Sequence, residues 1–205
     1  GFEASDITVT NGSIGNFSGS DSVYTFDITP SENGTVSVRV PAEVCVGSNN
    51  LKNRATNLLS IIYDNQNPTI AITSTKSSPT TSNSIPITVK FSENVTGFTS
   101  SDITLTNSSI SDFSGSNDTY TFTLLPTEEG PITINIAANV AVDAANNGNT
   151  AAQEFSIVFD NGVDPTVTIS SSSVFPTNNP NTQITITFSD KVEGFNSDDI
   201  TISNI

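Results

Sequence analysis

Acidic side chains are the residues of this sequence best suited to chemistry. The 205 residues include 21 Asp and Glu against 6 Lys and Arg, with one Cys and no His. Without His, triads that use an imidazole base are excluded, and a zinc site would lack its usual ligands. Ser and Thr are abundant, but they fit the polar faces of strands better than they fit nucleophiles. What remains is the binding of a hard cation such as calcium, which takes about 6–8 oxygen ligands.

The acidic residues recur at the same places in a long repeat. The stretch Phe91–Thr104 returns as Phe188–Thr201, and its second half also stands at the start of the chain. A phenylalanine after a glycine gives the period: from Phe2 to Phe98 is 98 − 2 = 96 residues, and from Phe98 to Phe195 is 195 − 98 = 97. A period of this length is domain-sized and suits a β-sandwich of about 100 residues.

Apolar residues alternate with polar ones along the repeat, which is typical of strands with one buried and one wet face. Turn residues such as Ser114–Asn117 and Asn146–Gly148 separate the alternating stretches. The pattern predicts an all-β fold in which two antiparallel sheets pack face to face. We expect strands near Thr69–Thr73, Ile85–Phe91, Asp102–Thr106, Ile110–Phe113 (a short one), Thr119–Leu125, Pro131–Ala137 and Gln153–Phe159.

The period also divides the chain. Residues 2–64 align with residues 98–160 at a constant offset of 96, without a gap. We therefore expect three domains: the rear five strands of one repeat in residues 1–67, a complete repeat in 68–164, and the first strands of another in 165–205. Because the sequence starts and stops in mid-repeat and lacks an initiating Met, we expect it to be part of a longer array. The linkers are short, which favours an extended rod.

Four motifs resemble a known family. They are Gly97–Thr104, Asn16–Gly19, Tyr120–Phe122 and Asp143–Asn149, and they look like the bacterial Ig-like repeats of large surface adhesins and other secreted multidomain proteins. The resemblance covers the whole chain. It implies tandem Ig-like β-sandwich repeats, neighbouring repeats as partners, and a place outside the cell or on the bacterial surface.

This chain departs from the family pattern at two positions. The family usually has Gly where Asn146 stands, a mild change because Asn tolerates the left-handed conformation. In the first repeat, Gly47 stands where the second repeat has Asp143.

The carboxylates fall where such a sandwich would bring them together. The connections after its second and sixth strands lie at one end, where the first strand begins and the preceding linker enters. We therefore expect one calcium site from Asp64, Asn67, Glu93, Asp102 and Asp143, and a second from Asp160, Asp164, Asp190 and Asp199. The layout resembles cadherin-like junctions, where calcium stiffens a linker. The alternative is that these are solvated loop residues.

Composition narrows the function further. A formal net charge of −15 argues against nucleic acid and against an anionic membrane surface. The expected sandwich has no obvious cleft for paired carboxylates, so we expect no enzyme. Two hypotheses remain: a structural spacer of an adhesin, and a module that binds a glycan, a host surface or a matrix protein. Most Phe and Tyr fall on inward or repeated positions, which favours the spacer.

Two smaller expectations concern the ends of the chain and its cysteine. The two terminal pieces together carry the strands of one sandwich, so head-to-tail pairing between chains is a further hypothesis. Cys45 aligns with Ala141, which predicts a small buried side chain rather than a reactive thiol.

Overall fold

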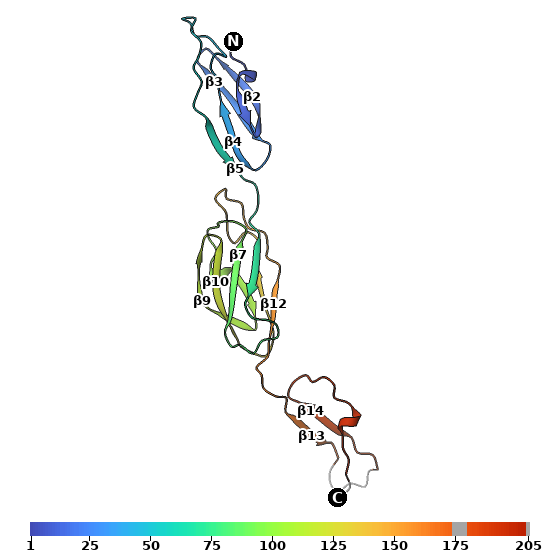
Figure 1. Ribbon diagram of the computed structural model, residues 1–205. Helices are drawn as coiled ribbons and strands as arrows, with labels where there is room; N and C mark the ends of the chain where they lie inside the picture. Colours follow the sequence, from blue (N-terminus) through green and yellow to red (C-terminus); the bar gives the residue numbers. More distant parts are fainter. Residues whose placement is uncertain (174–179, 204–205) are drawn as a thin grey trace.

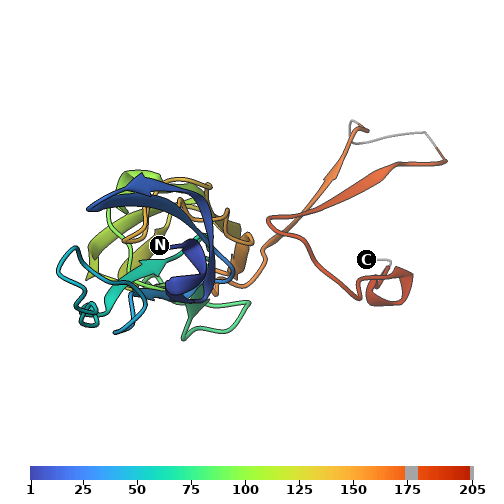
Figure 2. The ribbon, with the colours of Figure 1, turned by 90° about the horizontal axis from the view of Figure 1, so that it is seen from above.

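The structure is a computed structural model, and it describes residues 1–173 and 180–203. Its described elements are fourteen strands and three short 3₁₀ turns. They form three groups that follow one another along the chain, with the two termini at opposite ends (Figure 1). Seen from above, the C-terminal hairpin stands away from the axis shared by the other two groups (Figure 2). The prediction of an all-β, Ig-like chain is confirmed.

The middle group is a two-layered sandwich. One sheet has the order β6-β7-β10-β9 and the other the order β12-β11-β8, and all their pairings are antiparallel. Its strands are β6 (Ile70–Ser74), β7 (Ile85–Phe91), β8 (Ile103–Thr106), β9 (Ser108–Ser116), β10 (Thr119–Pro126), β11 (Gly130–Ile136) and β12 (Phe155–Phe159).

Alternation along the strands builds the core between these sheets. In β7 every second side chain, from Ile85 to Phe91, is buried, while Pro86 and Lys90 are exposed. The ring of Phe91 meets the rings of Phe98 and Tyr120 edge to face, with centroids 5.2 and 5.9 Å apart. Each fully buried apolar side chain of this size contributes about 1.5–3 kcal/mol, so the central strands hold the sandwich together.

The N-terminal group repeats the rear of this sandwich. It contains a sheet of order β1-β4-β5 and a hairpin of β2 and β3. Its apolar side chains are less covered than their counterparts: Ile61 is 49% exposed, whereas Ile157 is 2% exposed. The strands are β1 (Thr8–Thr10), β2 (Gly12–Ser20), β3 (Val23–Pro30), β4 (Gly34–Arg39) and β5 (Leu59–Tyr63).

The C-terminal group is a hairpin of β13 (Val167–Ser171) and β14 (Ile184–Phe188), the counterparts of β6 and β7. Each group also carries the same 3₁₀ turn just before or after its strands: η1 (Ala4–Asp6), η2 (Ser100–Asp102) and η3 (Ser197–Asp199). The predicted domain boundaries after residues 67 and 164 stay predictions.

Some strand boundaries were predicted wrongly. The strand expected to be short, at 110–113, is the nine-residue β9. A bulge opposite Phe122, where Asp112 takes a positive φ of 55°, lets the pairing with β10 continue past the irregularity. Asp102 lies in η2 rather than in a strand, and the last strand begins at Phe155 rather than at Gln153.

Candidate metal centre

Three of the predicted carboxylates meet at the end of the sandwich that faces the N-terminal group. One oxygen from each of Asp64, Glu93 and Asp143 lies within 4.8 Å of the others. Asp64 follows β5 in the linker, Glu93 follows β7, and Asp143 lies in the connection after β11. The Asp143 side chain is buried and the other two are half-buried. The site therefore joins the linker to two separate loops of the middle repeat.

The loop after β11 is built around the Asp143 carboxylate. Its Oδ1 accepts hydrogen bonds from the backbone N–H groups of Ala145 and Asn147, both at 2.8 Å, and its Oδ2 accepts one from Asn147 Nδ2 at 2.9 Å. Burial alone would raise the pKa of Asp143, but the hydrogen bonds from Asn147 and Ala145 outweigh it and hold that pKa below its usual value. Asp143 is therefore held as a fixed negative charge.

The linker is tied to the same loop. Asn147 Nδ2 donates to the Asp64 carbonyl oxygen at 3.2 Å, and Asn67 Nδ2 donates to the Gly148 carbonyl oxygen at 2.6 Å. The Asp64 carboxylate accepts a hydrogen bond from the backbone N–H of Gln66 at 3.0 Å. These contacts bring Asp64 to the loop without any cation. Asn67 thus stands beside the site, with its amide nitrogen engaged by the loop backbone.

Glu93 completes a group of like charges. Burial raises the pKa of Glu93, and the negative charges of Asp64 and Asp143 raise it further. Repulsion of this kind is relieved either by a proton or by a cation. Because the three groups offer only oxygen, the donor set suits a hard cation such as calcium rather than zinc or copper.

Sequence comparison now assigns the fold family. The family model described as bacterial Ig-like domain matches residues 64–159 and again residues 161–205. The chain belongs to the bacterial Ig-like domain family. Domains of this family are generally non-enzymatic structural modules and are typically extracellular or surface-associated. No curated protein and no solved structure matches the chain.

Within the described residues of this bacterial Ig-like chain, no helix is long and apolar enough to cross a membrane. In the same part of the chain, Asp64, Glu93 and Asp143 form the one group of three or more acidic, His or Cys side chains close enough to share a metal ion.

Asp102 does not join the carboxylates that the sequence analysis grouped with it. Its Oδ2 accepts hydrogen bonds from the backbone N–H of Thr99 at 2.7 Å and from Thr99 Oγ1 at 2.8 Å, which closes η2. Asp6 and Asp199 close η1 and η3 in the same way, each by accepting from a backbone N–H three residues earlier. This carboxylate recurs in the bacterial Ig-like repeat because a turn needs it.

The second junction is arranged differently from the prediction. Asp160 and Asp190 lie near Glu129, which precedes β11 and was not predicted as a site residue. Burial raises the pKa of Glu129, and the charges of Asp190 and Asp160 raise it further. Asp164 is exposed in the linker, and Asp199 closes η3. The equivalent position in the first repeat holds Asn33, so the aligned repeats showed no recurring carboxylate that would have pointed to Glu129.

One structural residue escaped the sequence analysis altogether. The Asn149 side chain is 1% exposed and makes four hydrogen bonds. Its Oδ1 accepts from the N–H groups of Val140 and Ala141, and its Nδ2 donates to the carbonyl oxygens of Ala137 and Thr150, at 2.8–2.9 Å. It holds both arms of the Asp143 loop together.

The first repeat contains the same asparagine. Asn53, 149 − 96 = 53, accepts a hydrogen bond from the Cys45 N–H at 3.0 Å and donates to the carbonyl oxygens of Pro41 and Arg54. An Asn at the same aligned position in both repeats was the available signal.

Proposed function

We propose that the chain is a non-catalytic spacer of a bacterial cell-surface or secreted adhesin, and that calcium stiffens the junctions between its repeats. The observation that carries the proposal is the meeting of Asp64, Glu93 and Asp143 within 4.8 Å. A cation held there binds the linker and the following repeat at once. Neighbouring repeats in the same chain are then the partners that matter for its mechanical role.

The ligand arithmetic supports calcium. Three carboxylates supply three to six oxygens, depending on whether each binds through one atom or two, and water or backbone carbonyls complete the usual shell of about 6–8. Asp143 is already held by its loop, so little order is lost when a cation binds it. Asp64 stands in the linker after β5 and not in the sandwich. Binding therefore restrains the linker more than it restrains the sandwich.

The placement of the aromatic residues favours a spacer over a glycan- or protein-binding module. Phe98, Phe113 and Tyr120 of the middle repeat pack against one another, with centroids 5.1–6.0 Å apart. Residues of this type commonly form the contact surface of binding modules, where they lie exposed. In the middle repeat these aromatic rings pack inside the sandwich instead of forming an exposed contact surface.

Calcium titration of the full 205-residue chain tests the proposal. We expect isothermal titration calorimetry to detect calcium binding, and small-angle scattering at low protein concentration to detect a narrower range of shapes with calcium than with a chelator. If calcium produces no binding heat and scattering is identical in both conditions, the stiffening mechanism is wrong. If calcium binds but scattering is unchanged, the site exists and its mechanical role does not.

A further inference from the structure

Four asparagines of the chain stand directly before a glycine: Asn11, Asn33, Asn147 and Asn161. An Asn–Gly pair has a chemistry of its own, because the backbone nitrogen of the glycine can attack the side-chain amide carbon of the asparagine. Glycine has no side chain to block this approach. The four pairs differ in how firmly the fold holds the glycine.

Three of the four glycines are fixed by strand pairing. Gly12 opens β2 and Gly34 opens β4, and each is paired with a neighbouring strand. Gly148 forms an antiparallel bridge with Val142. Ring closure requires the backbone to turn after the asparagine, and a paired glycine cannot turn without breaking its pairing. The fold therefore protects these three Asn–Gly pairs.

The fourth pair, Asn161–Gly162, lies in the linker after β12, outside every described strand. Gly162 has a φ of 70°, in the left-handed region that glycine enters more easily than other residues. A Cβ built on Gly162 would have the Thr81 side chain as its nearest contact, at 3.5 Å. This glycine is free of the strand pairing that restrains the other three.

Hydrogen bonds reach each of the three groups that take part in the reaction. The electrophile is the Asn161 side-chain carbonyl, whose Oδ1 accepts from the Val163 N–H at 2.8 Å. The nucleophile is the Gly162 nitrogen, whose N–H donates to Asp160 Oδ1 at 2.8 Å. The leaving group is Asn161 Nδ2, which donates to Glu129 Oε2 at 3.0 Å. The Asn161 amide is thus folded over the backbone of the next two residues.

Each contact favours ring closure for a physical reason. The bond from the Val163 N–H polarises the amide carbonyl and stabilises the negative charge that develops on its oxygen during attack. The Asp160 carboxylate lies at the proton that the Gly162 nitrogen must lose, which is the position of a general base. The bond to Glu129 fixes the orientation of the amide, so less entropy is lost on the way to the transition state.

We propose that Asn161 modifies itself, losing its amide nitrogen as ammonia in a reaction promoted by Asp160. The Gly162 nitrogen forms a bond to Asn161 Cγ, and its proton passes to the Asp160 carboxylate. The bond between Cγ and Nδ2 then breaks, and the nitrogen takes up this proton and leaves as ammonia. The product is a succinimide ring. Water, the only other reactant, opens the ring at either carbonyl carbon and leaves aspartate or isoaspartate in place of Asn161.

The product changes what holds the second junction. The Asn161 amide donates to Glu129, whereas a carboxylate in its place cannot donate and adds a negative charge beside Glu129, Asp160 and Asp190. Isoaspartate also lengthens the backbone of the linker by one carbon. Both products lose the tie between the linker and the turn before β11, so the modification loosens this junction with time.

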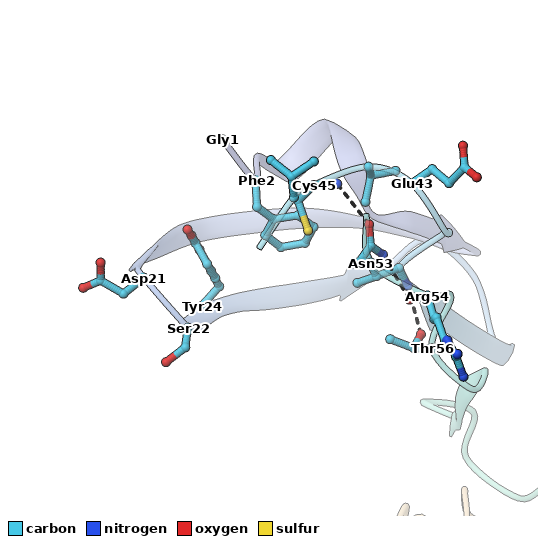
Figure 3. A pocket seen from close by; sticks show the side chains of 13 residues that line it. Gly1, Phe2, Asp21, Ser22, Tyr24, Glu43, Cys45, Asn53, Arg54 and Thr56 are labelled. Atoms are coloured by element: carbon cyan, nitrogen blue, oxygen red, sulfur yellow. Dashed lines mark hydrogen bonds between the residues drawn. The ribbon is translucent and has the colours of Figure 1, made fainter. Parts of the chain in front are cut away.

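Two other asparagines serve as internal controls. In the first linker the Gln66 N–H donates to Asp64 Oδ1 at 3.0 Å, as the Gly162 N–H does to its own aspartate, but Gln66 carries the side chain that blocks attack on Asn65. Asn53, drawn in Figure 3, is held by three hydrogen bonds and is followed by Arg54. Neither Asn65 nor Asn53 is expected to convert.

Peptide mapping by mass spectrometry tests the proposal on the full chain, kept at neutral pH and sampled over time. We expect Asn161 to convert first, and about tenfold faster than Asn147, a ratio that corresponds to about 1.4 kcal/mol of barrier. The same chain unfolded in urea gives the intrinsic rates of the four Asn–Gly pairs. We expect Asn161 to react faster in the native protein than in urea, and the other three to react more slowly.

Two variants of the linker test the role of Asp160. Asp160→Asn keeps an oxygen that accepts the Gly162 N–H but removes the base, so it is expected to slow native Asn161 by at least about tenfold. Asp164→Asn makes the same change of charge at an exposed position of the same linker and is expected to leave the rate unchanged. The slow conversion of Asn147 in each sample shows that the middle repeat remains folded.

Hydrogen exchange of the backbone amides at positions 160–164 tests the consequence for the junction. Asn161→Asp reproduces one of the two products, and we expect this variant and the aged protein to exchange faster there than fresh protein does.

Three results overturn the assignment of the reaction. They are a native rate of Asn161 below its rate in urea, an unchanged rate in Asp160→Asn, and an equal slowing by Asp164→Asn. Exchange that is the same in fresh protein, aged protein and Asn161→Asp overturns the loosening of the junction.

Discussion

Replacing Glu93 by Gln tests the metal centre in two opposite directions. The variant keeps the shape of the side chain and removes one of three negative charges that lie within 4.8 Å. Burial, and then the charges of Asp64 and Asp143, raise the pKa of Glu93. Without calcium, the variant removes both the burial of a charge and the repulsion, so the free energy of unfolding is expected to increase. With calcium, the variant lacks a charged ligand, so the stabilisation by calcium is expected to fall.

The separation of the charges sets the stability gain without calcium, and the calcium affinity sets the loss of stabilisation with calcium. Two unit charges 4.8 Å apart repel by about 0.9 kcal/mol under water-like screening, which is the appropriate limit for a half-exposed Glu93. We expect a gain of about 1 kcal/mol without calcium, or about 4–8 °C in Tm for a domain of this size. Calcium at a hundredfold excess over Kd stabilises the native protein by about 2.7 kcal/mol, whereas a tenfold weaker site gains only about 1.4 kcal/mol.

Thermal unfolding in calcium and in chelator measures these differences. The control is Asp102→Asn, because Asp102 closes η2 and lies outside the group of three. It is expected to lower Tm equally in both conditions and to leave the calcium-dependent difference intact. The reasoning is refuted if Glu93→Gln keeps the full calcium response, or if Asp102→Asn abolishes it while leaving Tm in chelator unchanged.

Three shorter predictions concern stability. Asn149→Ala removes the side-chain partner of four backbone groups, one buried and three part-buried, and should cost about 3–5 kcal/mol in urea unfolding. Phe91→Ala should cost about 3–5 kcal/mol in the same assay, because the ring is 1% exposed. In chelator, unfolding free energy should rise as pH falls through the raised pKa of Glu93. It should then drop below about pH 3.8, because the lowered pKa values of Asp143 and Asp118 keep them charged in the native protein while the unfolded chain takes up protons.

Alternation was enough to predict the core of the sandwich. In β7 and β11 every second residue is apolar, and these side chains are buried as expected. A strand pattern fixes the face that each side chain occupies, because the period of two leaves no choice once one face is buried. It does not fix where a strand ends. The extent of β9 depends on the left-handed conformation of Asp112, which the residue type permits but does not require.

Part of the carboxylate cluster could also be predicted from general rules of strand arrangement. Glu93 and Asp143 could be brought together from topology alone, since the connections after the second and sixth strands share one end of such a sandwich. The sequence position of Asp102 did not show that its side chain lies outside this cluster. Its carboxylate turns back to the Thr99 N–H three residues earlier, and this local hydrogen bond outweighs any attraction to a distant site. Asn149 was missed because an asparagine among many looks like a turn residue until its burial is known.

The two junctions show how one repeat can be adjusted by single substitutions. At the first junction the preceding repeat contributes Asn33, whose Oδ1 accepts a hydrogen bond from the Asn65 N–H at 3.1 Å and whose Nδ2 approaches Asp64 at 3.5 Å. At the second junction Glu129 stands in its place and accepts from Asn161 Nδ2 at 3.0 Å. The turn before β4 or β11 therefore reaches the linker in both cases, once as a neutral amide and once as a carboxylate.

The replacement of Asn33 by Glu129 changes the contacts that hold the linker. A neutral Asn33 donates to the linker carboxylate and needs no cation to do so. Glu129 instead adds a charge beside Asp160 and Asp190, and burial first, with the repulsion from Asp190 and Asp160 added, raises the pKa of Glu129. Carboxylates therefore oppose one another at both junctions: Asp160 and Asp190 with Glu129 at the second, and Asp64 and Asp143 with Glu93 at the first.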